Sequence, residues 1–324
     1  MALGVSEEHL ELAASVRGWA ERHGGPDVVA DSYPGVLRAG LAGQGLLGLH
    51  LPEENGGQGY GLSEQAVALE ELGRALVPGG FLPTVLASAL LARTDNPTGN
   101  SDIAKLLAGL ADGSRTGAVS LAAGLTGAIS DDGLILDGES APVLGGGLAD
   151  LLVLPVRTGE DELWAVVDAA DLTVTGLDSL DQSRPLARVR ASGLRVPAGR
   201  ILPGLTRTQV TSLTAALFAA EACGIADWAV QTAADYARIR HQFGRPIGQF
   251  QAVKHRCARM LTAAEQAAAA SWDAVIAVAS GPSLDSSGST MTPPRRLGSW
   301  TTSEPPSSKR TLHRSQDASR RRGA

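Results

Sequence analysis

The chain has 324 residues, of which 44% are hydrophobic and 19% are charged, with a formal net charge of −6. This length allows two or three domains with a substantial core, and the acidic balance gives no reason to expect nucleic-acid binding. No apolar run of about 18 residues is evident, so we expect no membrane partner. Cys223 and Cys257 have no CxxC partner. They are expected to be buried small residues, without a disulfide scaffold or structural zinc.

Residues 1–24 combine acidic side chains with helical periodicity, whereas a secretory signal needs a basic start and an apolar run. The sequence therefore predicts a cytoplasmic protein. Ser6 is expected to cap a first helix, and Ser63 is expected to cap a later helix that stops at Pro78. A GxGxxG pattern at residues 43–48 follows a helical pattern instead of a strand, so we expect no dinucleotide-binding site there.

Residues 113–204 change character, because short aliphatic runs alternate with Gly, Asp and Pro. This pattern is typical of a small all-β domain, either a barrel or a sandwich. Strands do not alternate with helices, so nothing suggests a parallel sheet. With helical patterns in residues 1–112 and 205–280, the sequence predicts an α+β multidomain protein. Its parts are an N-terminal helical domain, a middle β-barrel domain and an incomplete C-terminal helical bundle.

Two long helices are expected in the C-terminal domain. The first is Ala-rich and starts near Thr206, and the second runs from Phe250 to about Ala279. Glu221 lies inside the first helix, where a carboxylate satisfied by a partner, or one at an interface, is favoured over a catalytic group.

The bend between these helices contains Gly244, Pro246 and Gly248 and is surrounded by Arg and Lys. Arg240 and Gln251 lie on opposite arms of the bend. They could aim a guanidinium and an amide at one anionic group, such as a phosphate. A solvated basic face is the alternative interpretation.

Residues 281–324 are rich in Ser, Pro, Thr and Arg and carry eight Lys or Arg against three acidic residues. A disordered extension or an out-of-frame terminus is expected, and a basic nucleic-acid arm is a third alternative. The six histidines form no HExxH pattern, and neither GxSxG nor GxxxxGK[ST] occurs. We therefore expect no metal site, catalytic triad or P-loop.

Residues 240–251, RHQFGRPIGQFQ, resemble the signature of the acyl-CoA dehydrogenase family, in which an Arg precedes QFG, PI and FQ. Residues 51–82 are similar to the family's N-terminal helical domain, with its PEE-GG loop and EELGR helix. Residues 180–197 resemble the end of its β domain, and residues 219–240 resemble the helix that leads into the signature. Together these matches cover most of residues 1–280.

The resemblance implies a flavoprotein of fatty-acid or steroid side-chain degradation. It implies that FAD oxidises the α,β bond of an acyl-CoA thioester and that an electron-transfer flavoprotein reoxidises the flavin. By the same resemblance, Arg240, Gln242, Phe243 and Gln251 contact FAD that is held mainly by a neighbouring subunit. A homo-oligomer, or a hetero-oligomer with another acyl-CoA dehydrogenase-like subunit, is therefore expected.

The chain departs from the family pattern at three places. The Thr-Glu-Pro-like motif and the Trp-Ile-Ser/Thr motif that face the flavin are replaced by VSLAAGLTG and ESAPVLGGG. The usual catalytic glutamate has no counterpart, because the tail stands at its position. Some relatives place the base on the helix before the signature. This chain has Thr214 at that position, and a threonine cannot serve as a carboxylate base. No catalytic residue is assigned. The alternatives are a non-catalytic partner or scaffold subunit and an unstable product of a damaged gene.

Overall fold

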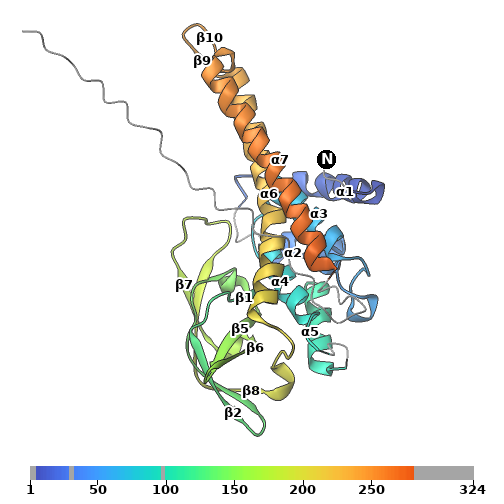
Figure 1. Cartoon of the computed structure of the whole chain (residues 1–324), viewed down its shortest axis with the longest axis vertical. Helices are drawn as coiled ribbons and strands as arrows, with labels where there is room; N and C mark the ends of the chain where they lie inside the picture. Colours follow the sequence, from blue (N-terminus) through green and yellow to red (C-terminus); the bar gives the residue numbers. More distant parts are fainter. Residues whose placement is uncertain (1–4, 29–32, 96–98, 281–324) are drawn as a thin grey trace, which may run out of the picture. The chain divides into compact units, whose positions relative to one another are not determined.

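The computed structural model describes residues 5–28, 33–95 and 99–280. Within this part of the chain, helices come first, strands follow, and a pair of long helices closes the order (Figure 1). This is the α+β architecture that the sequence predicts. The Ser/Pro/Arg-rich segment 281–324 lies outside the described residues, and the interpretations of it stay predictions.

The N-terminal part is built from helices joined by short turns. Ser6 caps α1 as predicted, because its hydroxyl accepts from the His9 amide while the His9 ring accepts from the Ser6 amide. The expected cap at Ser63 is wrong. Gly61 precedes the helix instead, and its amide donates to the Glu64 carboxylate at 2.8 Å. The elements are α1 (Glu7–His23), η2 (Tyr33–Leu37), α2 (Arg38–Gly43), η3 (Leu46–Gly48), η4 (Glu53–Asn55), α3 (Leu62–Arg74), α4 (Phe81–Leu91) and α5 (Ser101–Ala111).

The middle part is one mixed sheet of eight strands. The strands and short helical turns are β1 (Gly117–Val119), β2 (Leu125–Ser130), β3 (Gly133–Glu139), β4 (Val143–Leu144), η5 (Gly146–Leu148), β5 (Leu151–Thr158), β6 (Asp161–Asp168), η6 (Ala169–Asp171), β7 (Thr173–Leu177), β8 (Leu186–Pro197) and η7 (Ala198–Arg200). The strand order is β1-β5-β2-β3-β8-β4, with β6 paired to β5 and β7 paired to β8.

The sheet is not a parallel one, since most of its pairs are antiparallel, but β5 pairs in parallel with both β1 and β2. The chain reaches β5 from β2 through the β2–β3 hairpin and β4, so a parallel neighbour arises without a βαβ unit. The inner face of this sheet buries an apolar cluster that includes Leu136, Leu152, Leu154 and Val189.

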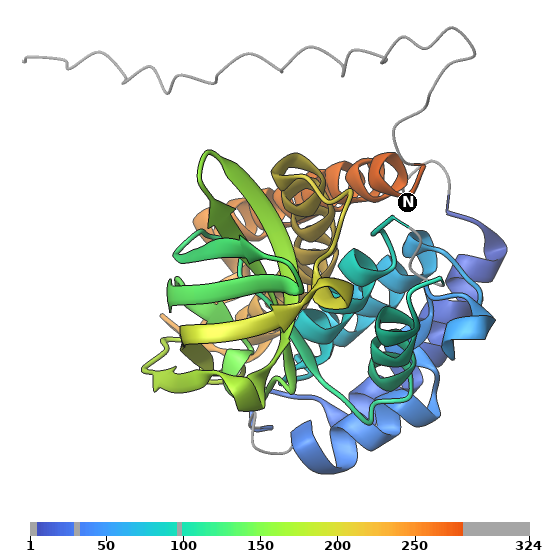
Figure 2. The same cartoon turned by 90° about the horizontal axis from the view of Figure 1, so that it is seen from below.

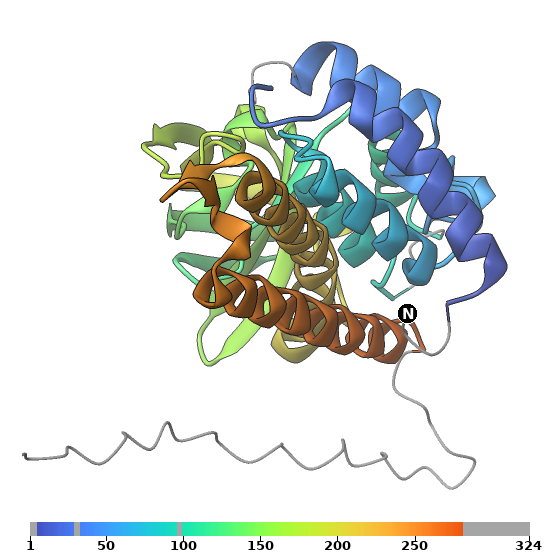
Figure 3. The same cartoon turned by 90° about the horizontal axis from the view of Figure 1, so that it is seen from above.

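The last part is a helical hairpin whose bounds agree with the prediction. Thr206 caps α6 (Arg207–Ile239), and α7 (Gln251–Ala279) follows Phe250. The turn between them contains β9 (His241–Gln242), β10 (Arg245–Pro246) and η8 (Ile247–Gln249). Viewed from below and from above, α6 passes between the sheet and the N-terminal helices (Figures 2 and 3).

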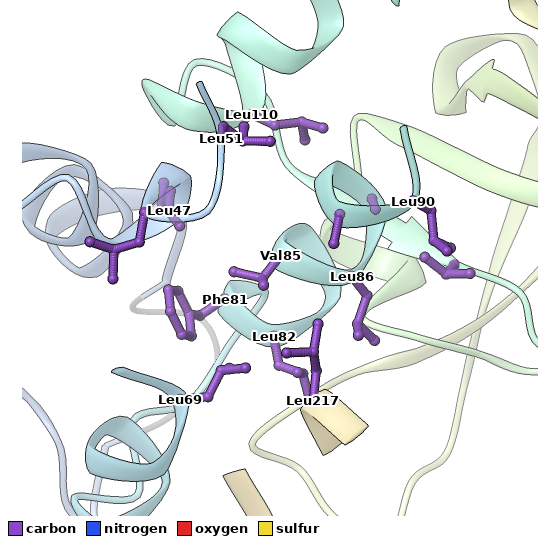
Figure 4. Close-up of a cluster of buried hydrophobic side chains, with 14 of the residues drawn as sticks. Leu47, Leu51, Leu69, Phe81, Leu82, Val85, Leu86, Leu90, Leu110 and Leu217 are labelled. Carbon is purple, nitrogen blue, oxygen red and sulfur yellow. The ribbon is translucent and has the colours of Figure 1, made fainter. Parts of the chain in front are cut away.

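Helix α4 lies at the centre of the main core, and every one of its residues is buried. Figure 4 shows Leu82 and Val85 of α4 among leucines from several other elements, including Leu69 of α3 and Leu217 of α6. Because α3, α4 and α6 share this core, the N-terminal helices and the final hairpin do not have separate hydrophobic cores.

Helices α3 and α6 cross in backbone contact. A Cβ atom at Gly73 would collide with the carbonyl oxygen of Glu221, and a Cβ at Gly224 would collide with the carbonyl oxygen of Glu70. Glycine is therefore required at both positions because of space, since neither residue has a positive φ angle.

Helix α6 contains an apolar stretch of the length that the sequence analysis did not find. Within the described residues it is long and apolar enough to cross a membrane, with a mean hydropathy of 1.4 over its most apolar 18-residue window. Half of that window is buried inside the chain. Its buried residues include Val210, Leu213 and Leu217. Packing against the other helices therefore accounts for its apolar composition.

Candidate functional site

The turn of the α6–α7 hairpin brings the signature residues together. The amide of Arg240 donates to the Tyr236 carbonyl, and the Arg240 carbonyl accepts from the Ile247 amide at 2.7 Å. Gln242 pairs with Arg245 across the two short strands. These bonds close the turn, so the chain leaves α6 at Arg240 and enters α7 at Gln251 within one compact tip (Figure 1).

Phe243 lies at this tip with an uncommon backbone conformation and an exposed side chain. Its φ angle is +53°, a left-handed value that a bulky side chain rarely adopts, and its side chain is 91% exposed. The ring of Phe250 supports it from the side at 6.1 Å between centroids, and the Arg245 guanidinium lies 4.4 Å above the Phe250 ring. Strained backbone at an exposed aromatic residue is typical of a functional contact.

The four residues expected to bind a cofactor therefore share one surface. Arg240, Gln242 and Gln251 are exposed like Phe243, and within the described residues their side chains have no hydrogen-bond or ion-pair partner. By contrast, Arg238, two residues before Arg240, is bound to Asp235 at 2.6 Å. A free guanidinium and two free amides are the donors that an anionic group with polar edges requires.

Thr214 does not belong to this surface. It is 2% exposed, and its hydroxyl donates to the Val210 carbonyl at 2.7 Å, one turn earlier in α6. At 1.5 Å per residue, Thr214 lies about 38 Å from the end of α6 at Ile239. One copy of the chain cannot bring Thr214 and the tip to the same ligand.

A small apolar cavity lies between α4, α6 and the turns that follow β1 and precede β4, and its α6 wall is Phe218, one helical turn after Thr214. Its volume is about 130 Å³. That is close to an engineered apolar cavity of about 150 Å³ that binds one benzene molecule. The lining residues are Pro83, Leu86, Val119, Leu121, Ala122, Pro142, Leu144 and Phe218. Sequence reasoning missed this cavity, because its residues come from four separated segments and share no motif.

Two hydroxyl groups stand where the family's flavin-facing motifs would fall. The Ser120 hydroxyl donates to the Ala122 carbonyl at 3.1 Å, and the Ser140 hydroxyl donates to the Ala141 carbonyl at 2.7 Å. Both serines are buried. Their hydroxyl protons are used by the adjacent backbone, so neither is free to donate to a ligand in this conformation.

Glu221 is a carboxylate satisfied by a partner within the chain, one of the two roles that the sequence predicts. It is 4% exposed and accepts two hydrogen bonds from Arg184, of which the bond from Nη1 to Oε2 is 2.6 Å long. Burial raises the pKa of Glu221, and the charge of Arg184 opposes this shift. A carboxylate that is bound at both oxygens is not available as a base.

A second cavity, of about 460 Å³, lies among α1, α3, α6 and α7. Burial is the main reason that the pKa of Glu70 in its wall is raised, and Arg74 opposes the shift. Another wall residue, Glu71, accepts two bonds of 2.8 Å from Arg17. None of the residues predicted to bind a cofactor lines this cavity, and we assign it no chemistry.

Neither cysteine bonds to another cysteine in the described chain; Cys223 is buried as expected, while Cys257 is only half-buried. Among the described residues, no group of three or more His, Cys, Asp or Glu side chains is placed to hold a metal ion.

Comparison with known sequences yields two family matches. Residues 6–113 match the family described as "Acyl-CoA dehydrogenase, N-terminal domain", and residues 207–291 match "Acyl-CoA dehydrogenase, C-terminal domain". The chain is 35% identical over 296 residues to the acyl-CoA dehydrogenase FadE34 of Mycobacterium tuberculosis. That alignment covers 86% of this chain but only 39% of FadE34.

The solved structures that are similar to the chain include two with more than 25% identity. The "Tcur3481-Tcur3483 steroid ACAD G363A variant" has 30% identity and a TM-score of 0.76, and the match covers 85% of this chain and 79% of that one. The ChsE4-ChsE5 complex from Mycobacterium tuberculosis has 26% identity and a TM-score of 0.79, with 87% and 80% covered.

Proposed function

Because the chain belongs to the acyl-CoA dehydrogenase family of FAD-dependent oxidoreductases, we propose that it is a subunit of an enzyme that oxidises the α,β bond of an acyl-CoA thioester. One observation carries the assignment of its role. The cofactor-binding residues lie at an exposed tip about 38 Å along α6 from the alternative base position, Thr214. The tip therefore serves a cofactor in a neighbouring subunit.

The residues at the tip fit FAD. Arg240 offers a free guanidinium to the pyrophosphate, Gln242 and Gln251 offer amides to polar edges, and Phe243 offers an exposed ring. FAD, when bound, supplies the hydride acceptor for the β carbon. The contribution of this chain is to orient the anionic part of the cofactor and to exclude water from one side of it.

The residues around the small cavity fit a subunit without its own catalytic base. The described lining of this cavity contains no carboxylate, and the Thr214 hydroxyl is bound to its own helix. The buried Glu221 is bound by Arg184. In our proposal, the proton at the α carbon is removed by a carboxylate of another subunit, while this chain binds the apolar acyl group.

We assign the chain to a hetero-oligomer with a second acyl-CoA dehydrogenase-like subunit. A complex of two different proteins, ChsE4 and ChsE5, is among the similar structures, which supports this choice. Another similar structure is that of a steroid enzyme, and this supports a substrate from steroid side-chain degradation. A cytoplasmic location and an electron-transfer flavoprotein as electron acceptor complete the proposal.

The second candidate is a non-catalytic partner subunit that only completes the cofactor site of its neighbour. The Ser120 and Ser140 hydroxyls favour it specifically, because both already donate to adjacent backbone carbonyls and are not free to hold a flavin beside the small cavity of this chain. The two candidates differ in whether this chain binds the acyl group, so a thioester-binding measurement with the small cavity blocked, for example by Leu86→Trp, separates them.

Cofactor retention in a mixed oligomer tests the proposal. The chain is co-expressed with a family subunit that carries the catalytic glutamate, and the FAD content of the complex is read from its absorbance. A charge-assisted hydrogen bond contributes about 1.5–3 kcal/mol. Arg240→Ala should therefore weaken FAD binding about 10- to 100-fold, whereas Arg238→Ala, which removes a guanidinium already bound to Asp235, should leave it unchanged. Equal effects of the two substitutions, or no association of the subunits, would refute it.

A further inference from the structure

A single buried ion pair joins three parts of the molecule. Arg184 lies in the connection between β7 and β8, and Glu221 lies on α6. Arg184 is 9% exposed and Glu221 is 4% exposed. The backbone of Glu221 lies against Gly73 of α3, where the two helices cross. The pair therefore ties the sheet to α6 at the point where α6 meets the N-terminal helices.

The residues beside Arg184 extend this junction through the backbone. The Ser183 carbonyl accepts from the Gly79 amide at 2.9 Å, just before α4. The Pro185 carbonyl accepts from the Gly145 amide at 3.0 Å, just after β4. Three consecutive residues thus contact three elements. The Arg184 side chain binds α6, the Ser183 carbonyl binds the residues that lead into α4, and the Pro185 carbonyl binds the turn after β4.

The same three bonded elements carry three of the four walls of the small apolar cavity. Phe218 lies on α6 about one turn before Glu221, Pro83 lies four residues after Gly79, and Leu144 directly precedes Gly145. Pro83 also packs against Gly145. A shift of segment 183–185 would therefore displace all three walls relative to one another.

A buried ion pair rarely adds net stability over a well-packed apolar pair, because the desolvation of both charges offsets their attraction. Its two directed bonds do fix the relative position of the groups that it joins. We infer that Arg184 and Glu221 are positioning residues that hold the walls of the small cavity in register and so set the size of the acyl group that it accepts. The statement about the acyl group rests on the proposed function, whereas the statement about the walls does not.

Amide hydrogen exchange of the full chain tests the positioning directly. Arg184→Met and Glu221→Met should each speed exchange of the Gly79 and Gly145 amides at least tenfold. Each single variant also leaves one unpaired buried charge, which lowers stability. The double variant Arg184→Met/Glu221→Met removes both charges, so it should regain stability although the two hydrogen bonds are absent. In this double variant the Gly79 and Gly145 amides should still exchange fast. Normal exchange in the folded double variant would overturn the inference.

The matched control is Arg17→Met, which breaks another two-bond pair to a buried carboxylate, Glu71. It should raise exchange in α1 and leave the Gly79 and Gly145 amides unchanged. If it speeds those two amides as much as the double variant does, general destabilisation explains the effect and the positioning role is wrong.

Ligand selectivity tests the consequence for the acyl group. In the FAD-loaded oligomer, the double variant should change the ratio of the dissociation constants for butyryl-CoA and octanoyl-CoA at least fivefold, with the affinity for free CoA unchanged. An unchanged ratio would overturn the size-setting role. If no thioester binds to the unmodified oligomer, the proposed function fails, and amide exchange still decides whether the pair positions the walls.

Discussion

His50 offers a sharp test of the core around α4. Its Nδ1 lies 2.9 Å from the Gln65 side-chain oxygen and its Nε2 lies 3.2 Å from the Ser88 hydroxyl, and both partners are fully buried. Burial is the main reason that the pKa of His50 falls to about 4; the hydrogen bond with Gln65 opposes this shift, and the charge of Arg93 adds to it. The imidazole is therefore neutral in the folded protein at pH 7.

The sign of the pH effect follows from the two pKa values. In the unfolded chain His50 takes up a proton near pH 6.5, whereas in the folded chain it does so only near pH 4. The unfolded state therefore binds more protons between these values, and stability falls as the pH falls. Each pKa unit corresponds to about 1.4 kcal/mol, so the loss amounts to about 2.5 kcal/mol at pH 4.5. This is an upper value, because His50 is partly accessible to solvent.

The measurement is urea unfolding of the unmodified chain and of His50→Gln between pH 7 and pH 4.5. The free energy of unfolding of the unmodified chain should fall relative to the variant by up to that amount, since glutamine does not titrate. His241→Gln, at the exposed tip, controls for the loss of one histidine. A difference between the unmodified chain and His50→Gln that stays constant within about 0.5 kcal/mol over this range would contradict the buried neutral state.

Three further substitutions have defined outcomes. Gly224→Ala should destabilise the chain by about 2 kcal/mol or more in thermal unfolding, since a Cβ there meets the backbone of α3, whereas Gly43→Ala, with open space around it, should be neutral or stabilising. Phe243→Gly should relieve the left-handed strain and stabilise the chain by about 1 kcal/mol while weakening FAD binding, and a loss of stability would argue against the strain. Asn100→Ala removes the cap of α5 and a bond to the Gly199 carbonyl, so unfolding should cost about 1–2 kcal/mol less; an unchanged denaturant midpoint would contradict the cap.

The sequence predicted those parts of the fold that depend on local signals. The cap at Ser6, the start of α6 near Thr206 and the end of α7 near Ala279 follow from residues next to the helix ends in the chain. The parallel neighbours of β5 could not be predicted, because they depend on which distant strands meet in the sheet. The 18-residue apolar stretch of α6 was overlooked in the sequence, and its hydropathy alone would not have told a buried helix from a lipid-exposed one.

For the candidate site as well, residues close together in the sequence were predicted, and contacts between distant segments were not. The signature from Arg240 to Gln251 is contiguous, so its residues were identified from the sequence, although their contact with FAD stays a prediction. The small cavity and the Arg184 partner of Glu221 depend on segments far apart in the chain. The position of Glu221 inside an apolar helix indicated that its carboxylate has a partner. Only the fold shows that this partner is Arg184.

The contact between α3 and α6 has a consequence for how the chain folds. Gly73 meets Glu221, and Gly224 meets Glu70, about 150 residues later in the sequence. Contacts at such separation form late, because loop closure must occur before they add any stability. During synthesis Leu69 and Leu72 therefore stay without their final partners until α6 has left the ribosome. The nascent N-terminal half exposes this apolar surface during that interval, and a stall in translation before residue 224 should make it open to aggregation and proteolysis.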